Sequence, residues 1–251
     1  MALLNLTHLK TKYSLKVEKI VHVGAHEGQE VEEYLKVFSN VEINLFEPQT
    51  SLFATLETKF GKSKNIFLYN FALGSSIGSS SMYSASNGGL SSSFYKPKDH
   101  LIEHPEIEFE LKKDVFQIKT LNQLNILNVD FLNIDTQGYE MEVLKGSTDV
   151  LAKDVKYIIL EVNKRELYEG CPLVSDIDKF LKEYNFIRTD THYWNDSYSW
   201  GDAFYIKKEY INKFRIYFSI IKNTLYANKL IYKKLIYIRN FIWKIRKIAS
   251  F

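Results

Sequence analysis

The stretch that decides the fold is IVHVGAHEGQEVEEY, residues 20–34. It begins with an apolar run, passes through a turn that contains Gly24 and Gly28, and continues with Val31 and Tyr34 at helical spacing. This pattern predicts a strand, a tight turn and a helix. In open α/β sheets such a first turn binds a nucleotide-like ligand, because small residues let the ligand approach the backbone and the helix start offers free N–H groups.

Strands and helices are predicted to alternate along the rest of the chain. The predicted strands are residues 42–46, 66–70, 115–119, 131–134, 155–162, 186–189 and 204–206, and the predicted helices are residues 52–60, 120–124, 141–146 and 177–184. This alternation is typical of a doubly wound α/β sheet, and the last two strands are expected to form a closing antiparallel pair.

The composition suits one globular α/β domain with a modest appendage. The chain has 251 residues, of which 45% are hydrophobic and 15% aromatic, enough to fill a core. A single cysteine, Cys171, rules out an internal disulfide framework. The N-terminus does not read as a signal peptide, so residence in the cytoplasm is expected.

The net charge of +3 conceals an asymmetry between the tail and the rest of the chain. Residues 209–251 carry ten Lys or Arg and one acid, a net +9, which leaves −6 for the rest. Apolar residues in the tail recur at steps of three and four, which predicts a basic amphipathic helix. Such a helix suits an anionic membrane surface, a partner protein, a coiled coil or the chain's own domain, and it is too charged to span a membrane.

Three regions are therefore expected. Residues 1–19 form a lead-in, residues 20–208 form the main domain, and residues 209–251 form the tail. Because the main domain is acidic, nucleic acid is disfavoured as its partner.

A serine-rich stretch interrupts the main domain. Residues 75–93 contain ten serines, together with Met82, Tyr83 and Leu90. Low-complexity serine often marks a flexible linker. The apolar and aromatic residues within it favour a surface loop that is ordered, or is ordered by a ligand.

The first turn and the second predicted strand share features of a nucleotide site. The turn reads G-A-H-E-G rather than G-x-G-x-x-G, which counts against NAD. Glu47 ends the second strand before Pro48 and lies 23 residues after Gly24, near the spacing at which an acid reaches ribose hydroxyls. The alternative for Glu47 is a surface carboxylate at a strand end.

Two more acids lie where parallel strands present their functional groups. Asp135 follows a central strand, so it either faces the cleft beside Gln137 and Gly138 or caps the next helix, or both. Glu161 lies inside a run that is expected to be buried, where a carboxylate needs a metal, a proton or another partner. The alternative for Glu161 is a structural salt bridge.

Two histidines are candidate proton acceptors. His26 lies in the first turn, and His192 is close in sequence to Trp194, Trp200 and Asp202. A histidine of near-neutral pKa can take a proton from a hydroxyl, although an exposed or hydrogen-bonded structural histidine fits equally well. No pair of Cys or His residues has the spacing of a zinc site.

Together these segments resemble the FkbM family of S-adenosylmethionine (SAM)-dependent methyltransferases. The resemblance runs from about residue 20 to residue 207, and its most specific part is NIDTQGYEMEVLKG at residues 133–146. It also rests on VHVGAHEGQE, Glu47-Pro48, NFALG, the stretch ending in SSSF, and WGDAFYIK. The first turn departs from the common family pattern, because Val21 and His26 stand where the family more often has Asp and Asn.

The resemblance implies a class I methyltransferase fold, with seven strands, the last of them antiparallel, and SAM at the carboxyl ends of the strands. The residues that it places at the cofactor are Gly24, Ala25, His26, Glu27, Gly28, Glu47, Pro48, Ala72, Asp135 and Gln137. Family members methylate hydroxyl oxygens, often on sugars of glycans or polysaccharides.

The expected activity is therefore O-methylation of a sugar hydroxyl in a glycan, polysaccharide or glycolipid precursor. A hydroxyl is a poor nucleophile, so we expect either a base (Asp135, His192 or Asp202) or a divalent metal such as Mg²⁺ held by Asp135, Glu161 and Asp202. Two alternatives remain: an NAD-dependent Rossmann enzyme, and a non-catalytic SAM-fold adaptor that scaffolds a glycan-assembly complex.

Overall fold

The structure is a computed structural model that describes residues 4–194 and 198–211. Its helices are α1 (Leu6–Tyr13), α2 (Val31–Val37), α3 (Thr50–Phe60), α4 (His100–Glu103), η1 (Leu121–Leu124), α5 (Glu140–Lys145), α6 (Thr148–Lys153), α7 (Val174–Glu183) and η2 (Lys208–Tyr210). Its strands are β1 (Lys19–Val23), β2 (Glu42–Phe46), β3 (Ile66–Tyr69), β4 (Ala72–Leu73), β5 (Gly78–Ala85), β6 (Phe109–Lys119), β7 (Phe131–Ile134), β8 (Tyr157–Asn163), β9 (Phe186–Tyr193) and β10 (Trp200–Lys207).

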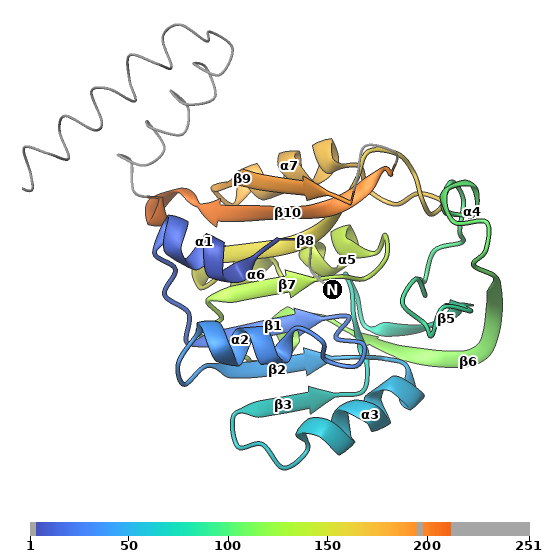
Figure 1. Cartoon of the computed structure of the whole chain (residues 1–251), viewed down its shortest axis with the longest axis horizontal. Helices are drawn as coiled ribbons and strands as arrows, with labels where there is room; N and C mark the ends of the chain where they lie inside the picture. Colours follow the sequence, from blue (N-terminus) through green and yellow to red (C-terminus); the bar gives the residue numbers. More distant parts are fainter. Residues whose placement is uncertain (1–3, 195–197, 212–251) are drawn as a thin grey trace, which may run out of the picture. The chain divides into compact units, whose positions relative to one another are not determined.

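The main sheet has seven strands in the order β3-β2-β1-β7-β8-β10-β9. Strands β3, β2, β1, β7 and β8 are parallel, while β10 runs antiparallel to both of its neighbours, as the arrowheads in Figure 1 make visible. The predicted doubly wound sheet with an antiparallel last strand is therefore confirmed. From β1 the chain first adds strands on one side, β2 and β3, and then crosses to the other side of β1, where β7 to β10 lie. Such a switch point in strand order is where open α/β sheets bind ligands.

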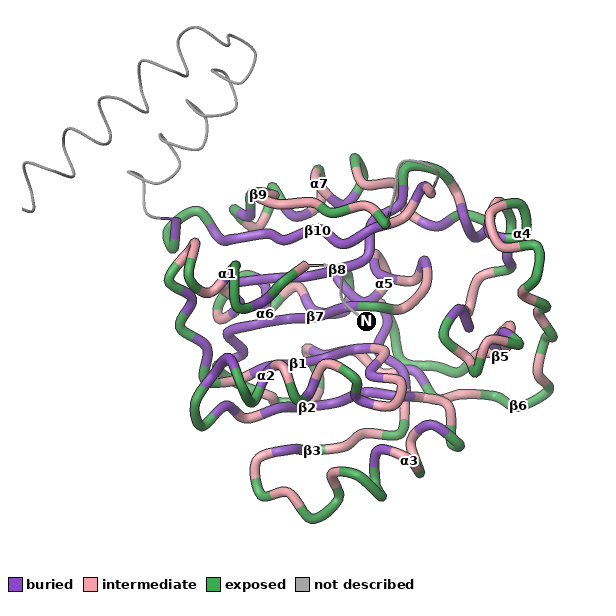
Figure 2. The backbone as a smooth tube through the Cα atoms, viewed as in Figure 1, coloured by how far each residue is buried: buried purple, intermediate pink, exposed green. Residues whose placement is uncertain are grey.

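Helices cover both faces of this sheet. On one face Tyr34 of α2 and Phe38, the C-cap of that helix, pack against Phe131 of β7, and α1 places Tyr13 against Phe204 of β10. On the other face the apolar residues of α5, α6 and α7 form one core with alternate residues of the central strands. The central strands are buried on both sides, as the purple tube in Figure 2 shows, which explains their continuous apolar sequences.

A second sheet of three strands, β4-β6-β5, lies beyond the carboxyl ends of the parallel strands (Figure 1). This sheet corrects two predictions. Part of the serine-rich stretch expected to be a loop is strand β5, and the strand expected at residues 115–119 is the eleven-residue β6. Both strands are mostly exposed or half-buried, so the pairing of their backbones holds them in place more than burial does.

The ends of the main domain differ in how far the structure describes them. The predicted lead-in contains α1, whose N-cap Asn5 accepts a hydrogen bond from the backbone N–H of His8. Of the tail, only residues 209–211 are described, so the predicted amphipathic helix and its membrane or partner contacts lie outside the described residues. Within the described part of the chain, no helix has the length and apolar character that crossing a membrane requires.

Candidate active site

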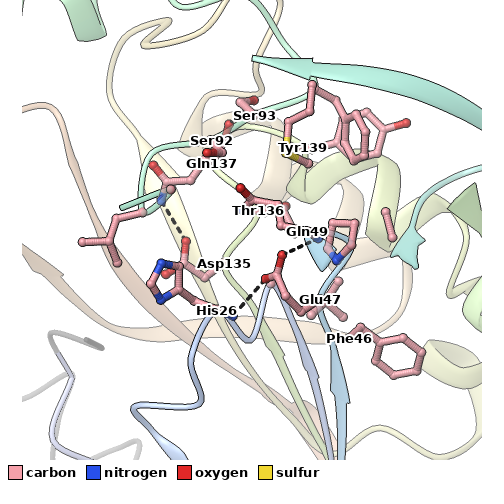
Figure 3. Close-up of a pocket in the computed structure, with 18 of the residues that line it drawn as sticks. His26, Phe46, Glu47, Gln49, Ser92, Ser93, Asp135, Thr136, Gln137 and Tyr139 are labelled. Atoms are coloured by element: carbon pink, nitrogen blue, oxygen red, sulfur yellow. Dashed lines mark hydrogen bonds between the residues drawn. The ribbon is translucent and has the colours of Figure 1, made fainter. Parts of the chain in front are cut away.

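A cavity opens at the carboxyl ends of β1, β2 and β7, beneath the serine-rich segment (Figure 3). Its floor comes from the first turn, the end of β2 and the turn after β7, and its roof comes from β5 and the residues that follow it. Seven predicted cofactor residues line this cavity: Gly24, His26, Glu47, Pro48, Ala72, Asp135 and Gln137.

Glu47 is held at the end of β2 by two backbone donors. The N–H of His26 donates to its Oε2 at 3.0 Å, and the N–H of Gln49 donates to its Oε1 at 2.8 Å (Figure 3). Its side chain is almost fully buried, and this burial raises the pKa of its carboxyl despite the two hydrogen bonds. Glu47 therefore joins the first turn to β2 at the wall of the cavity.

The first turn requires glycine at Gly24. Its φ of +81° is left-handed, and a Cβ there would lie 1.8 Å from the backbone oxygen of Asp135. The backbones of β1 and β7 thus approach closely just where both strands end. This approach brings His26 and Asp135 to the same cavity, as Figure 3 shows.

The turn after β7 explains the Asp-x-Gln-Gly-x-Glu pattern. Gln137 and Gly138 both have positive φ, and a Cβ on Gly138 would press on Tyr168 and Cys171 at 3.0 Å. Glu140 folds back under the turn, where its Oε1 accepts the backbone N–H groups of Thr136 and Gly138, each at 3.0 Å. Glu140 is fully buried, and this burial raises the pKa of its carboxyl to about 7.

Gln137 links two carboxylates. Its Nε2 donates to Oδ1 of Asp135 and to Oε2 of Glu161, both at 2.8 Å. Asp135 keeps accessible surface in the cavity although the surrounding protein partly desolvates it, and this desolvation raises the pKa of its carboxyl. Burial, followed by the nearby charge of Asp135, raises the pKa of Glu161 well above its usual range. The pair is therefore suited to hold one negative charge and one proton.

The serine-rich segment is tied down over the cavity by three contacts. The His26 ring donates from Nε2 to the carbonyl of Gly88 at 2.9 Å, while its Nδ1 accepts from Gln29 at 2.8 Å. The Ser93 hydroxyl donates to the carbonyl of Gln137 at 2.6 Å. The Tyr168 hydroxyl lies 2.9 Å from the Ser91 carbonyl and 3.1 Å from Oε1 of Gln137.

Three predicted cofactor residues do not line the cavity. Ala25 is fully buried behind the turn, and Gly28 packs against the Phe60 ring of α3. Glu27 points away and pairs with Lys59 of α3 at 3.1 Å. Successive residues of a tight turn point in different directions, so only some members of a contiguous motif face the ligand.

The remaining candidates lie farther along the same edge of the sheet. Glu161 on β8 is directly opposite Asp202 on β10, and Asp202 is directly opposite His192 on β9, but none of the three lines the cavity. Within residues 4–194 and 198–211, no three His, Cys, Asp or Glu side chains are grouped to hold a metal ion, so the expected metal trio is not assembled there.

One expected alternative role of Asp135 is not seen. Helix α5 begins after Tyr139, and no side chain caps it. Asp135 is five residues earlier and accepts from Gln137 instead.

Sequence reasoning missed several residues of the site. Gln49, Thr136, Tyr139 and Ser93 line the cavity, and Tyr168 reaches its roof from the segment after β8. Thr136 and Tyr139 lie within the motif that carried the resemblance, so attention to the whole motif would have found them. Tyr168 has no neighbouring motif that marks it.

The comparisons with known proteins indicate the family and the fold of the chain. The family described as the methyltransferase FkbM domain matches residues 22–188. The 2-O-methyltransferase NoeI of Sinorhizobium fredii (strain NBRC 101917 / NGR234) is 25% identical over 170 residues, which cover 63% of this chain and 69% of that protein. A crystal structure of methyltransferase FkbM from Methylobacillus flagellatus KT has a TM-score of 0.51 and 13% identity, over 76% of this chain and 43% of that chain.

The chain thus spans less than half of the length of that solved protein, whose likeness supports the fold. The family match covers most of the main domain, from β1 into β9. The chain belongs to the FkbM methyltransferase family, and its main domain has the class I fold of a SAM-dependent methyltransferase.

Proposed function

We propose that the protein transfers a methyl group from SAM to a hydroxyl oxygen of a carbohydrate, with the cavity at β1, β2 and β7 as the donor site. One observation carries this proposal. The cavity lining includes the carboxylates of Glu30, Glu47 and Asp135, and none of the described residues that line it is Lys or Arg.

That charge pattern fits SAM better than NAD. SAM carries a sulfonium and an ammonium against one carboxylate, a net positive charge that an acidic lining attracts. The pyrophosphate of NAD carries two negative charges, which three carboxylates would repel. Glu47 lines the cavity at the end of β2, where we expect it to accept from ribose hydroxyls, and the apolar side chains of Leu73, Met82 and Leu90 suit the adenine ring.

Asp135 is the residue that we assign as the base. Bound SAM supplies an electrophilic methyl carbon on sulfur. As the acceptor oxygen bonds to that carbon, the carbon–sulfur bond breaks and the hydroxyl proton must leave. Asp135 lies in the cavity and its raised pKa makes it a stronger base than an ordinary Asp, while Gln137 orients its carboxylate.

The choice of a sugar hydroxyl oxygen as the methyl acceptor has support that is separate from the charge of the cavity. NoeI is a 2-O-methyltransferase by name, and the family resemblance implies sugar hydroxyls. A hydroxyl needs both a base and alignment with the methyl carbon. The edge of the sheet beyond Asp135 carries more acceptors, Glu161 and Asp202, which suits a ligand with several hydroxyls.

Two measurements test the proposal. Calorimetry of the full chain with SAM and with NAD should detect SAM alone; binding of NAD would favour the oxidoreductase alternative, and binding of neither would favour the adaptor. Incubation with SAM and candidate glycans should then add about 14 daltons, one CH₂, to an acceptor seen by mass spectrometry. Absence of methylation on any glycan, with SAM bound, would reject the carbohydrate acceptor.

A further inference from the structure

A row of polar side chains leaves the donor cavity along one edge of the sheet. Asp135 follows β7, and Glu161, Asp202 and His192 are directly opposite one another on β8, β10 and β9. Residues directly opposite in a sheet project to the same face. At the usual spacing between strands, the row from β7 to β9 is on the order of 14 Å long, longer than one sugar ring.

A pair of stacked tryptophans stands at the far end of this row. The rings of Trp194 and Trp200 have centroids 5.5 Å apart and an interplanar angle of 15°. The backbone N–H of Trp194 donates to the carbonyl of Trp200 at 3.2 Å, and Trp200 packs against the buried cluster of Leu167, Tyr168 and Cys171. Trp194 is nevertheless 52% exposed, so a supported aromatic surface faces solvent.

An unsatisfied amide lies beside the tryptophans. Asn163 ends β8 directly opposite Trp200 and is 0% exposed, yet neither its Oδ1 nor its Nδ2 has a hydrogen-bond partner. A buried amide without partners costs free energy, so a bound water or a ligand hydroxyl is expected to complete its hydrogen bonds. An amide both accepts and donates, as a sugar hydroxyl does.

We propose that this edge strip, defined by Asp135, Glu161, Asp202, Asn163, Trp194 and Trp200, binds a neutral oligosaccharide acceptor. The proposal rests on the proposed function and names the substrate class of its acceptor side. One sugar ring stacks on Trp194, a further hydroxyl bonds to Asp202, Asn163 is buried behind them, and the reacting hydroxyl reaches Asp135.

The chemistry of the strip selects for this class of ligand. The C–H groups on one face of a sugar ring carry partial positive charge, which complements the negative face of an indole ring. Carboxylates accept hydrogen bonds from hydroxyls, and the negative charges of Asp135 and Asp202 repel uronates, sialic acids and sugar phosphates. A strip longer than one ring favours an oligosaccharide over a single sugar.

The test is a binding comparison on the full chain saturated with S-adenosylhomocysteine, the demethylated form of SAM. The probes are immobilised neutral oligosaccharides (malto-, cello- and chito-oligosaccharides of two to four rings) and oligosaccharides of uronic acids. Wild type should bind neutral oligosaccharides. Trp194→Ala should weaken that binding about tenfold, while Trp194→Tyr, which keeps an aromatic face, should retain most of it.

The matched control is Tyr210→Ala. Tyr210 is also an exposed aromatic residue, at 41%, but it follows β10 and so lies at the opposite edge of the sheet. Its removal should leave oligosaccharide binding unchanged. Calorimetry with SAM should give the same affinity for wild type and both Trp194 variants, because Trp194 does not line the donor cavity.

Three results would overturn the proposal: equal binding by wild type and Trp194→Ala, preference for uronic acid oligosaccharides, or no binding of any oligosaccharide. These failures are separable from failure of the proposed function, which SAM calorimetry and the mass gain decide. Methylation of a glycan with the same KM in wild type and Trp194→Ala, for example, would keep the function and reject the strip.

Discussion

Asp135 is the residue at which the donor cavity meets the edge strip, so its substitution separates chemistry from binding. In Asp135→Asn the new Oδ1 can still accept from Gln137 Nε2, which should preserve the turn. The base is lost, and we expect the rate constant of methyl transfer to fall by about 10²–10⁴. Single-turnover transfer measures this fall, and circular dichroism checks the fold.

The control for Asp135→Asn is the same change at Asp114, an exposed residue of β6 that does not line the cavity. It removes one negative charge and should leave transfer unchanged. If Asp135→Asn turns over at a near-normal rate, Asp135 has no part in the reaction, and the base must be sought among Glu161, Asp202 and His192.

The raised pKa of the buried Glu140 carboxyl predicts one contribution to the pH dependence of the free energy of unfolding. Burial raises the pKa of its carboxyl to about 7, so the folded protein holds a proton that the unfolded chain releases above about pH 4. The contribution of Glu140 to the free energy of unfolding should therefore be largest at low pH and fall as pH rises through the window from about 4 to 7, by on the order of 3 kcal/mol. Urea unfolding at several pH values across this window measures the slope.

Glu140→Gln removes the titration while its Oε1 can still accept from Thr136 and Gly138. We expect a flatter dependence of stability on pH in this variant. Glu108→Gln, at an exposed position, should keep the wild-type slope. An unchanged slope in Glu140→Gln would assign the effect to other groups.

At the scale of elements, the sequence predicted the main sheet well and the second sheet poorly. Strands such as β7 and β8 are buried on both faces, so their apolar runs identify them. Strands β5 and β6 bury few residues, and GSSSMYSA and FELKKDVFQIK show little periodic apolar pattern. Their structure comes from pairing with each other, a long-range interaction that local patterns do not encode.

The same contrast applies to the candidate site: residues at the ends of buried strands were predicted, and a residue that only the folded chain brings near was not. Glu47 and Asp135 end buried strands, and the rule that ligands bind at the carboxyl ends of parallel strands located both. Glu27 was misplaced because adjacency in a turn does not fix the direction of a side chain. Tyr168 was missed because it enters the site from a segment that only the folded chain brings near.

The roof over the cavity yields a prediction about SAM binding rather than about the transfer step. Tyr168→Phe removes the hydroxyl that holds Ser91 and Gln137 but keeps the ring in its buried position. The lost hydrogen bond and the unsatisfied acceptors should cost about 1–3 kcal/mol of stability. Because the roof is then less firmly held, we expect weaker SAM binding with little change in the rate of transfer.

Calorimetry and thermal unfolding check the Tyr168→Phe prediction. Tyr69→Phe is a matched control, since it also removes a hydrogen bond, to Asn44 at 3.1 Å, but outside the cavity. It should leave SAM affinity unchanged. Loss of SAM affinity in both variants would mean that the effect is general destabilisation.

At the scale of the whole molecule, charge is distributed unevenly between residues 1–208 and residues 209–251. The compact unit Met1–Lys208 contains every described strand, and Lys207 anchors its end by donating to the carbonyls of Leu151 and Ala152 at 3.0 and 2.8 Å. Residues 209–251 carry a net charge of +9. A chain ending at Lys208 should therefore keep the fold of the unit, while its net charge changes from +3 to −6 because ten of the 33 Lys and Arg residues are removed.

This division predicts how the protein behaves at a membrane surface. A basic residue near an anionic bilayer contributes roughly 1 kcal/mol, and ten of them with interleaved apolar residues should bind the full chain to vesicles rich in phosphatidylserine. The chain ending at Lys208, net acidic, should stay in solution. Cosedimentation measures both, with neutral vesicles and high salt as controls because screening weakens the attraction. Equal binding by the two chains would exclude the tail as a membrane anchor and leave a partner protein, a coiled coil or the chain's own domain as its expected contact.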